Sequence, residues 1–143
     1  MTRKPATLLD LEILWDELRE HERVTLDIER CRAILECPLT MAETIMHDGR
    51  ILGIVAAIEM WQGVYDVAVF PSVHVPNYAL TFVRAVKEVL KDPRLDAAHR
   101  LQTCSLADDQ TNKWMTILGF EYEGKLRKYT KNKDSYRMWA IVR

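Results

Sequence analysis

Residues 40–47 read TMAETIMH, an Asp-Gly pair follows at positions 48–49, and residues 50–60 read RILGIVAAIEM. The two flanks are rich in β-forming residues, and Asp-Gly supplies both turn positions at which a tight hairpin requires positive φ. A second turn is indicated by Gln-Gly at 62–63, and residues 64–70, VYDVAVF, predict a third strand. We therefore expect three consecutive strands that pair as an antiparallel meander.

The chain before this meander predicts a helical hairpin. Thr7 is a typical N-cap, with a carboxylate three residues later as its capping-box partner. Apolar residues then recur at helical spacing, which predicts a first helix at about 8–21. A second helix, capped by Thr25 or Asp27, ends before Pro38.

The chain after the meander alternates between helix and strand. Asn77 is a good N-cap, and the apolar residues of 78–91 lie on one helical face. The remaining predicted elements are a strand at 101–106, a helix from Asp108 or Asp109 to Gly119, and strands at 120–129 and 135–142.

The predicted element order is ααβββαβαββ. A strand–helix–strand unit over residues 64–106 requires a right-handed crossover, so its two strands are expected to be parallel neighbours. All other pairings are expected to be antiparallel. This predicts an α+β fold in which a mixed, mainly antiparallel sheet carries helices on both faces, in a single domain spanning 1–143.

Composition excludes several classes of protein. The chain is 48% hydrophobic and 29% charged, as is usual for globular proteins, and no apolar run approaches the roughly 20 residues of a membrane span. The N-terminus does not read as a signal peptide. Three cysteines without a C-x-x-C pair indicate reduced thiols and a cytoplasmic location, and the four scattered histidines predict no zinc site.

The net charge of −1 conceals an uneven distribution. Seven of the 20 Lys and Arg residues lie in 125–143, where Asp134 is the only acid. Such a basic segment can bind phosphates. Here the basic residues alternate with apolar and aromatic ones, which favours the solvated faces of a strand pair over a nucleic-acid site, and no membrane partner is expected.

The stretch from Asn112 to Tyr129 reads NKWMTILGFEYEGKLRKY. It resembles the end of the GCN5-related N-acetyltransferase (GNAT) fold, in which a helix ends in Leu-Gly-Phe and the next strand carries Glu-Gly and then Arg. The predicted element order is also similar, over nearly the whole chain. Within the family the chain looks most like small acetyltransferase-like proteins of tailed phages and prophages, which implies the host cytoplasm.

The resemblance implies transfer of an acetyl group from acetyl-CoA to the primary amine of a small molecule or protein. In GNAT enzymes the pantetheine arm lies between two splayed strands and pairs with free backbone, which here corresponds to Val67, Ala68 and Val69. The pyrophosphate sits at the N-terminus of the following helix. A carboxylate removes the amine proton, and a tyrosine commonly protonates the leaving thiolate.

The phosphate-binding loop departs from the family pattern. The usual arginine corresponds to His74, and the usual glycines correspond to Val75, Asn77 and Ala79. A Cβ at these positions keeps the backbone from closing on phosphates, and Pro76 removes another N–H donor. Weak or atypical acetyl-CoA binding is therefore expected.

The usual acid is also absent. The tyrosine that serves as the acid in the family corresponds to Met115, whose thioether cannot donate a proton. Tyr78 is therefore a candidate substitute for this acid. The usual asparagine that begins this helix corresponds to Asp108, which suits capping. Asp66 and Glu59 are the candidate bases because they lie on strands that line the amine site in the family, although either could be a surface carboxylate.

Two classes of function remain open from the sequence. The first is an N-acetyltransferase with an altered phosphate loop. The alternative is a catalytically degenerate phage module that acts as a virion or host-interaction protein. Cys104 could serve as a nucleophile beside the thioester, but cysteines on strands are mostly small core residues. The sequence leaves the oligomeric state open, a homodimer included.

Overall fold

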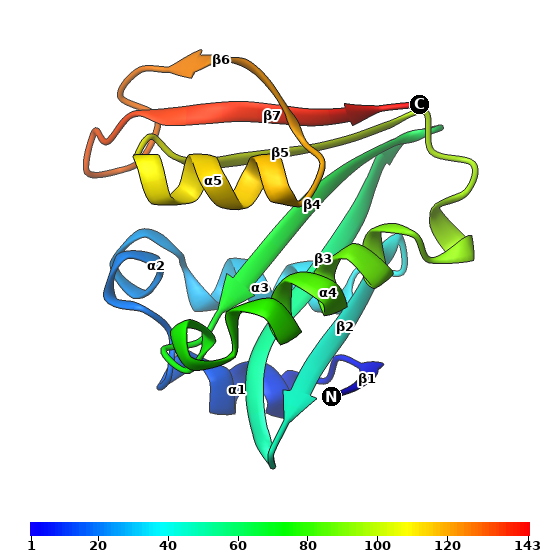
Figure 1. The fold of residues 1–143 in the computed structure, drawn as a ribbon, viewed down its shortest axis with the longest axis vertical. Coiled ribbons are helices and arrows are strands. Elements are labelled where there is room, and N and C mark those ends of the chain that lie inside the picture. Colours follow the sequence, from blue (N-terminus) through cyan, green and yellow to red (C-terminus); the bar gives the residue numbers. More distant parts are fainter.

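Seven strands form one sheet in the order β1-β2-β3-β4-β5-β7-β6 in the computed structural model, which describes all 143 residues (Figure 1). The strands are β1 (Thr2–Pro5), β2 (Thr40–His47), β3 (Arg50–Trp61), β4 (Val64–Pro71), β5 (Arg100–Leu106), β6 (Glu121–Leu126) and β7 (Tyr136–Val142). The helices are α1 (Leu8–Trp15), α2 (Glu20–Thr25), α3 (Ile28–Glu36), α4 (Ala79–Leu90) and α5 (Asp109–Ile117), with short 3₁₀ turns η1 (Val75–Tyr78) and η2 (Pro93–Leu95). The predicted α+β class is confirmed.

The predicted meander is confirmed in pairing and in turn geometry. Strand β2 pairs antiparallel with β3, and β3 pairs antiparallel with β4. Asp48 and Gly49 join β2 to β3 with φ of 51° and 71°, the conformation that Asp-Gly favours in a two-residue hairpin.

The first predicted helix is wrong in extent. Thr7 and Asp10 form the expected capping box, but α1 ends at Trp15 and α2 is a separate helix. Between them, fully buried Leu18 forms a β-bridge with Ser72, a contact across more than fifty residues that helical spacing alone does not indicate. The short exposed strand β1 was not predicted either.

The helix after β4 begins later than predicted. Asn77 lies in η1 and its N–H donates to the His74 carbonyl at 3.1 Å, so the N-cap of α4 is Tyr78 and not Asn77. The other predicted caps are confirmed. Asp108 accepts a hydrogen bond from the Thr111 N–H at 2.7 Å, and Gly119 follows α5 with φ of 95°.

Helices cover both faces of the sheet. Helices α4 and α5 lie over one face, where Phe82, Val86 and Trp139 belong to the larger core, while α1 and α3 cover a smaller core on the other face, with Leu14 and Ile54 (Figure 1). No helix combines the length and apolar character needed to cross a membrane.

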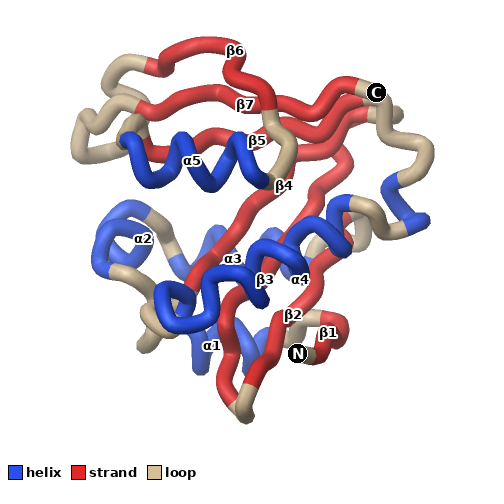
Figure 2. The backbone as a smooth tube through the Cα atoms, in the orientation of Figure 1, coloured by secondary structure: helices blue, strands red, loops and turns tan.

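Strands β4 and β5 are parallel, as predicted, but pair only over Val64–Asp66 and Arg100–Gln102. Beyond these residues they diverge, so the sheet splits into a β1–β4 part and a β5-β7-β6 part (Figure 2). This divergence creates the candidate site.

Candidate functional site

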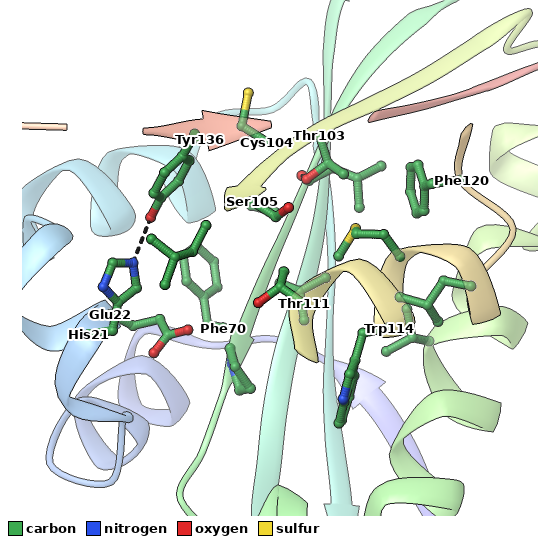
Figure 3. A pocket seen from close by; sticks show the side chains of 18 of the residues that line it. His21, Glu22, Phe70, Thr103, Cys104, Ser105, Thr111, Trp114, Phe120 and Tyr136 are labelled. Atoms are coloured by element: carbon green, nitrogen blue, oxygen red, sulfur yellow. Dashed lines mark hydrogen bonds between the residues drawn. The ribbon is translucent and has the colours of Figure 1, made fainter. Parts of the chain in front are cut away.

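A cavity of about 710 Å³ lies between the diverging ends of β4 and β5. Because neighbouring residues of a strand point to opposite faces of the sheet, the walls come from both faces. The cavity therefore has two sides, one beneath α4 and α5 and the other beneath α2 (Figure 3).

The side beneath α4 and α5 is mainly apolar. Its walls include Val67, Val69, Phe82, Val86, Trp114, Met115 and Phe120. The Thr103 hydroxyl donates to the Val67 carbonyl at 2.7 Å across the gap between the strands. This side suits an uncharged, flexible chain that needs a few backbone hydrogen bonds.

The side beneath α2 is polar around Asp66. This residue belongs to the last paired position of β4 and β5, opposite Gln102, whose Nε2 donates to Asp66 Oδ1 at 2.6 Å. The second carboxylate oxygen, Oδ2, has no partner within the protein. A carboxylate held in this way can accept a hydrogen bond or a proton from an incoming group.

A bridge between α2 and β7 closes this side of the cavity. The Tyr136 hydroxyl lies 2.9 Å from Nε2 of His21 (Figure 3). Burial, reinforced by the negative charges of Glu22 and Asp134, raises the pKa of Tyr136 to about 12. The phenol is therefore protonated at neutral pH and retains its hydrogen.

Cys104 lines the same side of the cavity but is not activated. Burial raises the pKa of its thiol, and its Sγ lies 3.9 Å from the Tyr129 hydroxyl. The thiolate is the nucleophilic form, so a neutral thiol here does not suit a covalent mechanism.

The segment after β4 offers few free N–H groups to an anion. Those of Ser72, Val73, His74, Val75 and Asn77 all donate within the protein, and Pro76 has none. The His74 ring is also held, with Nε2 2.9 Å from Glu17 Oε2. Only Tyr78 and the first turn of α4 remain as possible donors.

Six of the residues predicted from the sequence lie together in the cavity wall. They are Asp66, Val67, Ala68, Val69, Asp108 and Met115. Of the carboxylates in this group, Asp108 is engaged as the α5 cap, whereas Asp66 has a free oxygen.

The other five predicted residues lie outside the cavity wall: Glu59, His74, Asn77, Tyr78 and Ala79. Glu59 and Asp66 are not brought together, because Glu59 accepts from the Tyr65 hydroxyl at 2.9 Å and Tyr65 packs on the α4 side of the sheet. Tyr78 packs edge-on against His47, with ring centroids 4.9 Å apart.

Sequence reasoning missed the residues that α2 and β7 contribute. No sequence pattern marks His21 as a site residue, because its role depends on where α2 lies relative to β7. Gln102 and Tyr136 lie on predicted strands, where the period of two places each side chain on one face of the sheet. That spacing does not reveal that the face borders a cavity.

The solved structures similar to this chain include acetyltransferases. A ribosomal-protein-alanine N-acetyltransferase from Brucella melitensis is 14% identical over 100% of both chains, with a TM-score of 0.77. A GNAT-family protein from Desulfovibrio desulfuricans is 14% identical over 99% of this chain and 98% of that one, with a TM-score of 0.73. The chain has the GNAT fold.

A third similar structure holds ligands. It is a microcin self-immunity acetyltransferase in complex with acetyl-CoA and AMP, 15% identical over 97% of this chain and 89% of that one, with a TM-score of 0.68. No family model and no curated protein matches the sequence. At these identities the comparison establishes the fold, and function must be argued from the cavity.

Proposed function

We propose that this chain is an N-acetyltransferase that moves an acetyl group from acetyl-CoA to a primary amine. The observation that carries this proposal is the two-sided cavity at the divergence of β4 and β5. It brings an apolar channel on one face of the sheet to a carboxylate on the other. A thioester and an amine can therefore approach from opposite faces and meet between the strands.

The residues present fit the pantetheine arm better than the phosphates. Val67, Ala68 and Val69 would border the arm, with the apolar walls beneath α4 and α5 excluding water. The pyrophosphate would be left to the first turn of α4, because the preceding N–H groups are already bonded. Acetyl-CoA supplies the activated acyl group. We expect acetyl-CoA to bind weakly, because the segment before α4 has few free N–H groups for its phosphates.

Asp66 is the residue assigned to the amine. An amine must lose its proton to become nucleophilic, and the free Oδ2 of Asp66 can accept that proton directly or through water. The hydrogen bond from Gln102 holds the carboxylate in position. Tyr136 and His21 border the same side of the cavity and limit the size of the acceptor.

A second candidate function has its own support in the segment after β4. If the bonded N–H groups prevent acetyl-CoA from binding at all, the chain would be a catalytically degenerate GNAT-like module of a phage or prophage, acting as a virion or host-interaction protein. In either case we place the protein in the cytoplasm, because its three cysteines are free thiols.

Thermal unfolding with and without acetyl-CoA separates the two candidates. A ligand at about 100 times its dissociation constant stabilises the native state by about 2.7 kcal/mol. The N-acetyltransferase proposal expects a concentration-dependent rise in Tm at millimolar acetyl-CoA and acetylation of at least one amine in a mixed panel, detected by mass spectrometry. No shift at millimolar acetyl-CoA together with no acetylated amine would favour the degenerate module.

A further inference from the structure

A cationic loop stands at the mouth of the cavity, between β6 and β7. We define the mouth loop as residues 127–135. Tyr129, within the loop, and Tyr136, which follows it, both line the cavity, and their rings stack with centroids 5.5 Å apart. The mouth loop is thus continuous with the wall on the Asp66 side.

The cations of the mouth loop have no acidic partners. Arg127, Lys128, Lys131 and Lys133 are exposed, and none of them forms an ion pair within the protein. The single acid, Asp134, is turned toward Thr130, which hydrogen-bonds its backbone N–H at 3.0 Å. The positive charge is therefore available to a partner from solution.

The backbone that carries these cations is held by its own hydrogen bonds. The N–H of Tyr129 donates to the Asp134 carbonyl at 2.9 Å, and the N–H of Lys133 donates to the Thr130 carbonyl at 2.8 Å. The Ser135 carbonyl accepts from the N–H of Ala107 at 3.3 Å, which ties the loop to the end of β5. Binding a partner would therefore cost little ordering of the loop.

The charge changes sign between the mouth and the interior. The interior presents the Asp66 carboxylate, whereas the mouth presents four unpaired cations. A purely cationic acceptor such as a polyamine would be attracted by the Asp66 carboxylate and repelled by the cations of the mouth loop. We infer that the acceptor of the proposed reaction is an amine carried by an acidic peptide, which places its amine near Asp66 and its carboxylates against the mouth loop. This inference rests on the proposed function.

The surroundings of the loop favour an acidic peptide over a nucleic acid. Exposed acids lie beside the mouth loop on two sides. Glu20 is next to His21, which bonds Tyr136 at the end of the loop, and Asp109 begins α5, two residues after Ala107, which bonds Ser135. A phosphate backbone needs a continuous cationic track and would meet these carboxylates. A short acidic segment needs only the loop itself.

Two peptides of equal length test the inference. They share their N-terminal residue, whose amine is the single primary amine in each, and it is followed in one by aspartates and glutamates and in the other by arginines and glutamines. We expect kcat/KM for acetylation of the acidic peptide to exceed that of its basic counterpart by about tenfold or more at low salt, and the ratio to shrink as salt screens the loop.

Charge reversal in the loop should abolish this preference. In the double variant Arg127→Glu, Lys131→Glu, both substitutions fall at positions with ordinary negative φ, unlike Lys128 and Lys133. We expect the preference for the acidic peptide to be lost. The matched control is Lys87→Glu, Lys91→Glu, which changes the net charge equally at the far end of α4 and should keep the preference.

Direct binding provides a readout that does not require turnover. Fluorescence anisotropy of the labelled acidic peptide should give a dissociation constant that weakens about tenfold in the loop variant. Equal or tighter binding of the basic peptide, or loop-dependent binding of an RNA oligonucleotide that displaces the acidic peptide, would overturn the inference.

If the basic peptide is acetylated equally well, the acidic acceptor is wrong and the N-acetyltransferase proposal stands. If the acidic peptide binds but no amine is acetylated and acetyl-CoA does not bind, the proposed function fails instead.

Discussion

Asp66 owes its position to the place where the two parallel strands stop pairing. As part of the last β4–β5 pair it is held by backbone hydrogen bonding on one side, while its side chain faces the space that opens beyond. Gln102 occupies one carboxylate oxygen and leaves the other free. Position, rigidity and a free lone pair are the three properties that a base at this point requires.

Replacing Asp66 with asparagine should remove the proton acceptor and keep the shape. Loss of a positioned base costs about 10²–10⁴ in rate, so we expect kcat/KM for amine acetylation to fall within this range. Glu59→Gln is the matched control, because it neutralises a carboxylate on the other face of the sheet and should change the rate little. Calorimetry should show unchanged acetyl-CoA affinity in both variants. Equal losses in the two variants would contradict the assignment.

Met115, which the sequence resemblance aligns with the usual tyrosine acid, lines the apolar side of the cavity. In Met115→Tyr a hydroxyl would enter this side and could protonate a leaving thiolate, so we expect kcat to stay level or rise. Met115→Leu keeps the apolar wall without a donor and is the control. A large fall in kcat for the tyrosine variant, with stability unchanged in urea, would show that the cavity needs the methionine's shape.

At the scale of elements, the segment that joins β4 to α4 sets the expected affinity for acetyl-CoA. Its N–H groups are consumed by a turn around buried Ser72 and by contacts to Leu52 and Glu17. Val75 is itself part of the core, so glycine there would restore flexibility only at the expense of packing. The segment between β4 and α4 therefore has a structural role of its own, beyond lacking the glycines of a phosphate-binding loop.

We accordingly expect acetyl-CoA to bind in the high-micromolar to millimolar range, about −6 to −4 kcal/mol. Because the apolar cavity supplies most of the contacts to the ligand, the dissociation constant of acetyl-pantetheine should lie within about tenfold of that of acetyl-CoA. Isothermal calorimetry on both ligands checks this. Submicromolar acetyl-CoA binding, with acetyl-pantetheine far weaker, would show that the first turn of α4 holds the phosphates well.

Close packing of α4 on the sheet depends on Gly53. A Cβ at this position would lie 2.7 Å from the Phe70 carbonyl oxygen and 2.9 Å from the Phe82 ring, closer than atoms can approach. Since Phe82 also forms the cavity wall, Gly53→Ala should shift it and destabilise the protein by about 1–3 kcal/mol. Urea denaturation measures the loss. Wild-type stability in this variant would mean that α4 can move away without cost.

How far the sequence predicts an element depends on how local its determinants are. The Thr7 cap, the Asp48-Gly49 turn and the Gly119 helix end are each decided within a few residues, and all three are confirmed. The break after α1 is different, because Leu18 leaves the helix to pair with Ser72. Asn77 also fails as a cap for a non-local reason, since the turn around Ser72 places it inside η1.

At the scale of the whole molecule, the candidate site is a product of sheet topology. Sequence pattern predicted that β4 and β5 would be parallel neighbours, but not that pairing would stop after Asp66. The point where pairing stops depends on how segments far apart in the sequence pack together, which a strand pattern does not show. The wall residues from α2 and β7 could not be predicted for the same reason.

The bridge between His21 on α2 and Tyr136 on β7 closes the Asp66 side of the cavity. In Tyr136→Phe the link is lost, and we expect a loss of about 0.5–1.5 kcal/mol, the usual contribution of one hydrogen bond. The pH dependence gives a second test. The pKa of Tyr136 is raised to about 12 from an ordinary value near 10, so the folded state keeps this phenol neutral after the unfolded state has begun to ionise.

Its contribution to stability is therefore complete below about pH 10 and is lost as the pH rises toward 12. Wild type should lose stability relative to Tyr136→Phe over this interval, as measured by urea denaturation at pH 8, 10 and 11. Ultraviolet titration should show one late-ionising tyrosine fewer in the variant. A wild-type advantage that is constant across these pH values would mean that Tyr136 ionises normally, and that the cavity is open to water on this side.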